Sequence, residues 1–79
     1  MDTRGLPEEI RDRLAILLDI APEDIADDIA FSDLGVDSMM RLELVALVEQ
    51  RVGFELPESD LGELQTIETV VRYVDSLAA

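Results

Sequence analysis

Apolar residues recur at helical spacing in three segments of the chain, and this pattern predicts an all-α fold. The first segment runs from Pro7 to Asp19. Pro7 suits the first position of a helix, and the acidic Glu8 and Glu9 are favourable in a first helical turn. The apolar positions that repeat along the segment are Ile10, Leu14, Leu17 and Leu18. Residues 7–19 are therefore predicted to form the first helix.

The other two segments carry recognisable helix ends. A second helix is predicted from Ser38 to Val52, because basic Arg51 followed by Gly53 is typical of a helix C-terminus. The last helix is predicted to begin at Thr66, a residue type that caps helix N-termini well. Its apolar side consists of Ile67, Val70, Val71, Val74 and Leu77.

Two connections separate the three helices. Residues 20–37 form a long acidic connection in which at most one short helical turn is expected. Its scattered apolar residues, predicted to pin it to the helices, are Ile25, Ile29, Phe31 and Leu34. Residues 57–64 support only a short helical piece, because Gly62 interrupts it. The fold class is therefore a small four-helix bundle, three main helices and one short helix, with a long loop between helices one and two.

Length and charge narrow the class of protein. At 79 residues the chain is long enough for one domain, predicted over residues 1–79, whose core is too small for deep internal sites. Nineteen acidic residues against six basic ones give a net charge of −13, which repels nucleic acids and anionic membranes and favours basic protein partners. No apolar stretch is long enough for a membrane span, and the N-terminus lacks a signal-peptide pattern. A cytoplasmic monomer is expected.

The absence of two residue types excludes several kinds of chemistry. The chain contains no cysteine and no histidine, so disulfides, thiolate or imidazole metal ligands and Ser-His or Cys-His nucleophiles are impossible. The acidic loop does not contain the residue order of a calcium-binding EF-hand, so no metal site is predicted. Carboxylate pairs are too abundant here to indicate catalysis. The chain is predicted not to be an enzyme.

The second predicted helix has too many apolar residues for a single buried stripe. Leu44, Val48 and Val52 share one side and are predicted to face the core. The opposite side, with Ser38 near its edge, holds Met39, Leu42, Glu43, Ala46 and Gln50. Exposed apolar residues beside carboxylates such as Glu43 and Glu49 suit a transient docking surface for basic partners. The alternative is a helix buried on two sides.

Ser38 stands where this helix begins, and two interpretations are open. A serine here is often an N-cap. Asp37 caps equally well, however, and Arg41 stands where a capping box would need Glu or Gln. If Asp37 is the cap, the Ser38 hydroxyl is free at the positive end of the helix dipole, where an attached phosphodiester would be stabilised. Gly35 in the preceding turn has two possible roles: it permits the turn conformation, or it lets another protein approach closely.

The stretch FSDLGVDSM, residues 31–39, resembles the signature of acyl carrier proteins, in which a D-S-M or D-S-L tripeptide follows a D-L-G-x turn. The resemblance covers nearly the whole chain and includes MRLELVALVEQ and ELPESDL. It implies that a separate transferase attaches phosphopantetheine from coenzyme A to Ser38. The thiol of that arm would hold acyl groups as thioesters, in a chain that has no thiol of its own.

The resemblance also implies a partner surface. Asp37 would help to orient the phosphopantetheinyl transferase. The recognition helix would present its outward residues to a ketosynthase, an acyltransferase and other synthase enzymes. These residues are Met39, Leu42, Glu43, Ala46 and Glu49, and the short acidic piece with Glu58, Asp60 and Glu63 would extend the surface.

Several positions depart from the pattern of fatty-acid carriers. Met40 and Arg41 stand where polar or acidic residues are common, and Gln50 and Arg51 thin the carboxylates at the end of the helix. Polyketide or other specialised metabolism, such as antibiotic biosynthesis, is therefore favoured over fatty-acid synthesis. A peptidyl carrier usually has a second glycine where Val36 stands. An acidic interaction module without a prosthetic group would leave the serine unexplained. The initial methionine and the lack of linker tails favour a discrete carrier.

Overall fold

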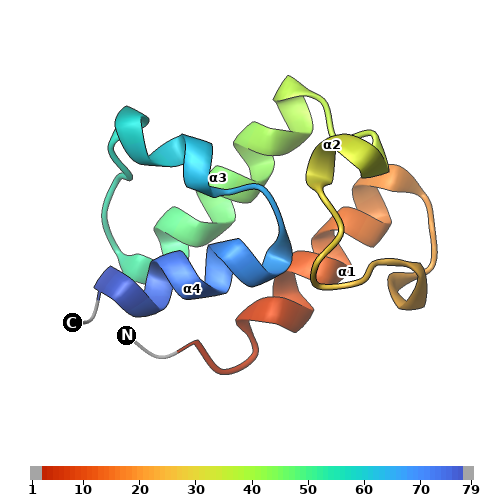
Figure 1. Ribbon diagram of the computed structural model, residues 1–79, viewed down its shortest axis with the longest axis horizontal. Helices are drawn as coiled ribbons and strands as arrows, with labels where there is room; N and C mark the ends of the chain where they lie inside the picture. Colours follow the sequence, from red (N-terminus) through yellow and green to blue (C-terminus); the bar gives the residue numbers. More distant parts are fainter. Residues whose placement is uncertain (1–2, 78–79) are drawn as a thin grey trace.

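The computed structural model describes residues 3–77 and consists of helices, with no strand in that range (Figure 1). Two residues at each end of the predicted domain, 1–2 and 78–79, lie outside the described part. The elements are α1 (Leu6–Leu18), the 3₁₀-helix η1 (Pro22–Asp24), α2 (Phe31–Leu34), α3 (Ser38–Val52), the 3₁₀-helix η2 (Glu58–Glu63) and α4 (Ile67–Leu77). The predicted all-α bundle with three main helices is confirmed.

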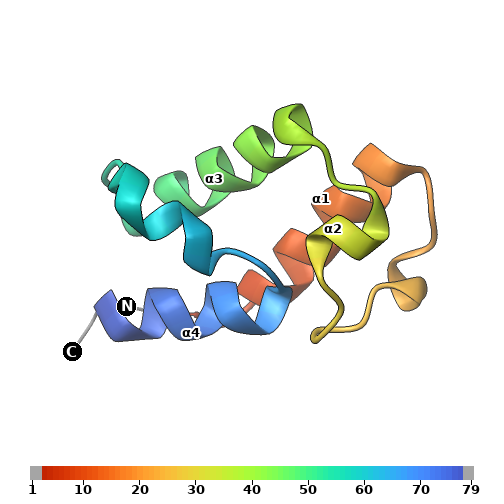
Figure 2. The same ribbon diagram turned by 45° about the horizontal axis from the view of Figure 1, so that its top comes forward.

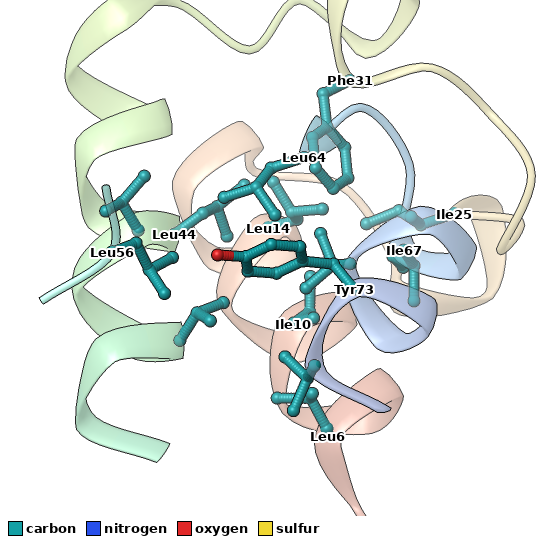
Figure 3. Close-up of a cluster of buried hydrophobic side chains, with 14 of the residues drawn as sticks. Leu6, Ile10, Leu14, Ile25, Phe31, Leu44, Leu56, Leu64, Ile67 and Tyr73 are labelled. Atoms are coloured by element: carbon teal, nitrogen blue, oxygen red, sulfur yellow. The ribbon is translucent and has the colours of Figure 1, made fainter. Parts of the chain in front are cut away.

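The three long helices enclose one core. α1 packs against both α3 and α4, and η2 packs against α4 (Figures 1 and 2). Buried apolar side chains from every long helix meet between them, as the close-up in Figure 3 shows. The most deeply buried are Leu6, Ile10, Leu14, Val48, Ile67 and Val74. This core fixes which side of α3 faces outward.

Three local predictions are corrected by the structure. α1 begins at Leu6 after Gly5, so Pro7 is its second residue and not its first. The long connection contains two short helical segments, η1 and α2, where at most one was expected. Gly62 does not interrupt the short piece, because a single 3₁₀-helix runs from Glu58 to Glu63. η2 packs against α4, and its Leu61 carbonyl accepts a hydrogen bond from Arg41 at 2.7 Å.

The long connection is held to the bundle as its apolar residues predict. Ile25 and Phe31 are buried, and Ile29 and Leu34 pack partly buried against the core. Figure 3 shows the Phe31 ring at the upper edge of the cluster, near Leu64. The backbone also contributes, since the Phe31 N–H donates to the Gln65 carbonyl at 2.8 Å. Contacts to the start of α4 therefore hold the connection in place. They also fix where α3 begins relative to the bundle.

The start of α4 confirms Thr66 as a cap. The Thr66 hydroxyl accepts a hydrogen bond from the Thr69 N–H at 3.0 Å, and the Thr69 hydroxyl accepts one from the Thr66 N–H at 2.9 Å. This reciprocal pair is a capping box in which threonine replaces the usual Glu or Gln. It satisfies two backbone donors that a helix start would otherwise leave unpaired.

A tyrosine joins α4 to η2. The Tyr73 hydroxyl donates to an Asp60 carboxylate oxygen at 2.6 Å, and the ring is buried in the core. Burial, this hydrogen bond and the negative charges of Asp60 and Glu63 raise the pKa of Tyr73 to about 12. The folded chain therefore favours the neutral phenol.

This raised pKa predicts alkaline unfolding controlled by one residue. The stabilisation is complete below the ordinary tyrosine pKa of 10.0 and is lost as the pH rises through about 12. The chain has one tyrosine, no cysteine and no lysine, so no other side chain titrates in that window. The melting temperature should fall from about pH 10 upward, and absorbance at about 295 nm should place the phenol ionisation above pH 10. Tyr73→Phe should remove the slope; a titration at the value of free tyrosine would contradict the prediction.

Candidate functional site

The start of α3 is capped by Asp37. Its carboxylate accepts a hydrogen bond from the Met40 N–H at 2.9 Å, and its backbone carbonyl accepts the Arg41 N–H at 2.9 Å. Ser38 is the first residue of the helix. The interpretation in which Asp37 caps and Ser38 does not is therefore confirmed.

The turn before Asp37 sets the position of this helix start. α2 ends at Leu34 and is followed by Gly35, whose φ of 91° lies in the left-handed region that favours glycine. The next residue, Val36, donates its N–H to the Phe31 carbonyl at 3.0 Å. Because Phe31 is anchored in the core, the turn ties the position of Ser38 to the bundle. Gly35 thus has a structural reason to be glycine.

Ser38 itself is exposed and chemically available. Within residues 3–77, its hydroxyl makes no hydrogen bond, and the backbone N–H groups of Ser38 and Met39 are likewise unpaired. These amides and the helix dipole favour a negative group at this point. A phosphodiester attached to the Ser38 oxygen fits here, because it would project into solvent and meet unpaired donors.

The other serines offer a poorer environment. Ser76 donates its hydroxyl to the Tyr73 carbonyl at 2.6 Å. Ser32 and Ser59 are exposed, but they lie in the four-residue α2 and in η2, not at the start of a long helix. Ser38 alone among the four combines exposure, a free hydroxyl and the start of a 15-residue helix.

The two sides of α3 differ as the sequence predicts. Leu44 and Val48 are buried and Val52 packs partly buried against the core, whereas Met39 and Leu42 are 74% and 63% exposed. The outward residues Glu43, Ala46 and Gln50 are also exposed. Large apolar side chains left in solvent on a small acidic protein are typical of a contact surface. The alternative of a helix buried on two sides is wrong.

The predicted partner carboxylates divide into two groups. Glu43, Glu58 and Glu63 are exposed, although Glu43 forms an ion pair with Arg13 at 3.1 Å. Glu49 is half-buried and accepts a hydrogen bond from the Leu56 N–H at 2.9 Å, so its carboxylate holds the chain that follows α3. Asp60 is half-buried and accepts the Tyr73 hydroxyl described above. The last two therefore have roles within the fold that the sequence did not reveal.

A further apolar residue, which was not among the predicted surface residues, lies beside this surface. Ile16 in α1 is 77% exposed and lines a groove between α1 and α3 together with Glu43, Ala46 and Gln50. Its position was detectable, since it lies two residues after Leu14 and hence about 200° around the helix from the buried side. Ile16 extends the exposed apolar area of α3 onto α1.

The interior below this helix offers no room for a ligand. The free space next to Phe31, Leu44 and Leu64 is about 10 Å³, which is at most the room that one water molecule needs. Within residues 3–77, no group of acidic side chains is arranged to hold a metal ion. None of the described helices is long and apolar enough to cross a membrane.

Comparison with known proteins found relatives that match most of the chain. Residues 8–74 match the family described as "Phosphopantetheine attachment site". An acyl carrier protein of Campylobacter hominis is 38% identical over 71 residues, covering 89% of this chain and 90% of that protein. An acyl carrier protein of Streptomyces coelicolor is 39% identical over 80 aligned positions, covering 99% of this chain and 87% of that protein.

Two further similarities are to parts of larger proteins. A non-reducing polyketide synthase of Emericella nidulans is 34% identical over 73 residues, which cover 92% of this chain and 3% of that protein. The NMR structure of the HMG-ACPI domain from the CurA module of Lyngbya majuscula matches with a TM-score of 0.75. That match covers 96% of this chain and 77% of that chain at 24% identity, and it supports the fold.

Proposed function

The chain belongs to the acyl carrier protein family, and we propose that Ser38 is the residue that carries its phosphopantetheine arm. Acyl carrier proteins hold this prosthetic group and have no catalytic activity of their own. The observation that carries the proposal is the free Ser38 hydroxyl. Asp37 supplies the cap, so modification of Ser38 leaves the helix start intact.

The composition of the chain shows which chemical groups must come from the phosphopantetheine arm and which the chain supplies itself. When bound, phosphopantetheine supplies a thiol that holds acyl groups as thioesters, which this cysteine-free chain cannot provide itself. The chain contributes the Ser38 hydroxyl that forms the phosphodiester, the unpaired backbone amides beside it and a helix start that is capped by Asp37. Its packed core leaves the attached acyl group at the surface in this conformation.

The partners follow from charge and exposure. We define the docking face as Met39, Leu42, Glu43 and Ala46, all exposed on α3. Apolar contacts there would be surrounded by carboxylates on a chain of net charge −13, which suits enzymes with basic docking surfaces. These partners are a phosphopantetheinyl transferase, a ketosynthase and an acyltransferase, acting on a cytoplasmic monomer. Glu58 and Glu63 extend this surface onto η2.

Polyketide or related specialised metabolism is the pathway class we favour over fatty-acid synthesis. The similarity to part of a polyketide synthase supports this assignment. The residues Met40, Arg41 and Gln50, which depart from fatty-acid carriers, support it as well. Elongation assays with a polyketide ketosynthase and a fatty-acid ketosynthase, each given the loaded chain, test the pathway class: preference for the fatty-acid enzyme would overturn it.

The carrier function is tested by incubating the chain with coenzyme A, magnesium and a broad-specificity transferase. Intact mass spectrometry should show the addition of one phosphopantetheinyl group, and peptide mapping should place it on Ser38. The transferase must be shown to be active on a known carrier in parallel. An unchanged mass would overturn the proposal and favour an acidic interaction module without a prosthetic group.

Two substitutions on the docking face should affect partner binding differently. Glu43→Lys should slow association and weaken its salt dependence, because it reverses a charge that attracts basic partners over a distance. Met39→Ala should mainly speed dissociation, costing about 1–2 kcal/mol, because it removes a desolvated contact. Stopped-flow or surface-plasmon kinetics with the transferase or a ketosynthase would separate the two effects.

Matched controls exist for both changes. Glu68→Lys reverses an exposed charge on α4, and Phe54→Ala removes an exposed apolar side chain from the segment after α3. Neither should alter partner kinetics. If Met39→Ala lowers the melting temperature sharply and leaves the kinetics unchanged, Met39 is a core residue and the docking face is misplaced.

A further inference from the structure

Arg41 stands out among the arginines of this acidic chain. Within residues 3–77, Arg11, Arg13, Arg51 and Arg72 each form an ion pair with a carboxylate. Arg41 forms none there, and its one hydrogen bond is donated to the Leu61 carbonyl at 2.7 Å. A guanidinium has five N–H donors, so most of its hydrogen-bonding capacity is unused. On a chain with three times as many acids as bases, a cation without a carboxylate partner calls for an explanation.

The position of Arg41 on α3 suggests why it has no carboxylate partner. It lies three residues after Ser38 on α3, and side chains at this spacing are neighbours on a helix surface. Its side chain also lines a surface pocket between α2, α3 and η2, together with Ser32, Gly62 and Gln65. The guanidinium is thus held against η2 by its bond to Leu61, on a residue one helical turn along α3 from Ser38, with further donors free.

We propose that Arg41 is a positioning residue that pairs with the phosphodiester on Ser38 while its bond to Leu61 is retained. This inference rests on the proposed attachment at Ser38. The phosphodiester adds a negative charge next to Asp37, and Arg41, one turn further along α3, provides a positive charge that offsets it. The guanidinium geometry permits one N–H to bind a carbonyl and others to bind phosphate oxygens.

Such a pair would direct the arm. Residues two apart on a helix lie about 200° apart around its axis, so Arg41 and Met39 occupy nearly opposite sides of α3. If Arg41 binds the phosphodiester, the phosphopantetheine arm extends from the protein surface on the side of the pocket between α2, α3 and η2. The arm would then start on the side of α3 away from Met39, which remains available to partners. Arg41 would therefore direct the cargo away from the part of the docking face that contains Met39.

The first test uses the unaltered chain before and after loading, with mass spectrometry confirming the modification. Side-chain Nε–H resonances of arginine, observed in a ¹⁵N-labelled sample, report directly on guanidinium hydrogen bonding. Loading should shift the Arg41 resonance and slow its exchange with water, while Arg72, which is paired with Glu68 on α4, should not change. An unchanged Arg41 resonance in fully loaded protein would overturn the proposal.

The second test is a cycle of apo and loaded forms of the native chain and of Arg41→Met. Loading should lower the melting temperature of Arg41→Met by about 3–6 °C more than that of the native chain at low salt, and this difference should shrink at high salt. Arg72→Met serves as the control and should behave like the native chain. If Arg41→Met does not fold, Arg41→Lys, which keeps the charge, replaces it and should show a smaller difference. Failure to load would overturn the carrier proposal as well, whereas loading without coupling overturns the role of Arg41 alone.

Discussion

Ser38→Ala is expected to abolish phosphopantetheinylation while the fold persists. Loss of the hydroxyl removes the acceptor of the phosphodiester, so intact mass spectrometry should show no addition under conditions that load the native chain fully. The helix start should remain, because the Asp37 carboxylate caps the Met40 N–H in both forms. Alanine is also a better helix former than serine, so the melting temperature should stay within about 2 °C.

Substitutions at three other residues provide the controls. Ser32→Ala and Ser59→Ala remove exposed hydroxyls elsewhere and should load like the native chain. Asp37→Ala removes the cap and should lower the free energy of unfolding by about 0.5–2 kcal/mol. Continued modification of Ser38→Ala would mean that another serine is the acceptor. A large loss of helicity in that variant would instead give Ser38 a structural role.

Local sequence signals were sufficient wherever a feature depends on neighbours in the chain. The helix end at Gly53 and the cap at Thr66 are set by residues within one turn, and the structure places both as predicted. Asp37, one of the two caps that the sequence left open, is the cap in the structure. The inward and outward sides of α3 also follow from helical periodicity. These signals locate Ser38 on an exposed helix start without knowledge of the tertiary structure.

The features that sequence reasoning missed depend on residues far apart in the chain. Glu49 bonds to the segment after α3, Asp60 accepts the Tyr73 hydroxyl, and Arg41 reaches η2. The sequence does not distinguish a carboxylate that accepts a hydrogen bond within the fold from one that attracts a partner. Only the tertiary packing decides which donor lies within hydrogen-bonding distance. The same holds for η2, whose 3₁₀-helix runs through Gly62 and which packs against α4.

Phe31→Ala should be the most destabilising change considered for this chain, because it removes the anchor of the segment that leads to Ser38. Phe31 is 2% exposed, and truncating a buried phenylalanine to alanine typically costs about 3–5 kcal/mol. A domain of this size has about 4–12 kcal/mol of total stability, so the loss should lower the melting temperature by more than about 15 °C. Thermal and urea unfolding followed by circular dichroism would measure it.

The chain contains two phenylalanines, and the second makes the control direct. Phe54 is 45% exposed, so Phe54→Ala deletes the same atoms with little lost burial and should cost less than about 1 kcal/mol. At a temperature where Phe31→Ala is still folded, its loading by the transferase should be slower than that of Phe54→Ala, because the turn through Gly35 loses its support while Ser38 itself is unchanged. Equal stability of the two variants would show that Phe31 does not anchor the connection. Equal loading rates, with unequal stability, would show that the transferase binds the start of α3 without needing the turn before it to be held in place.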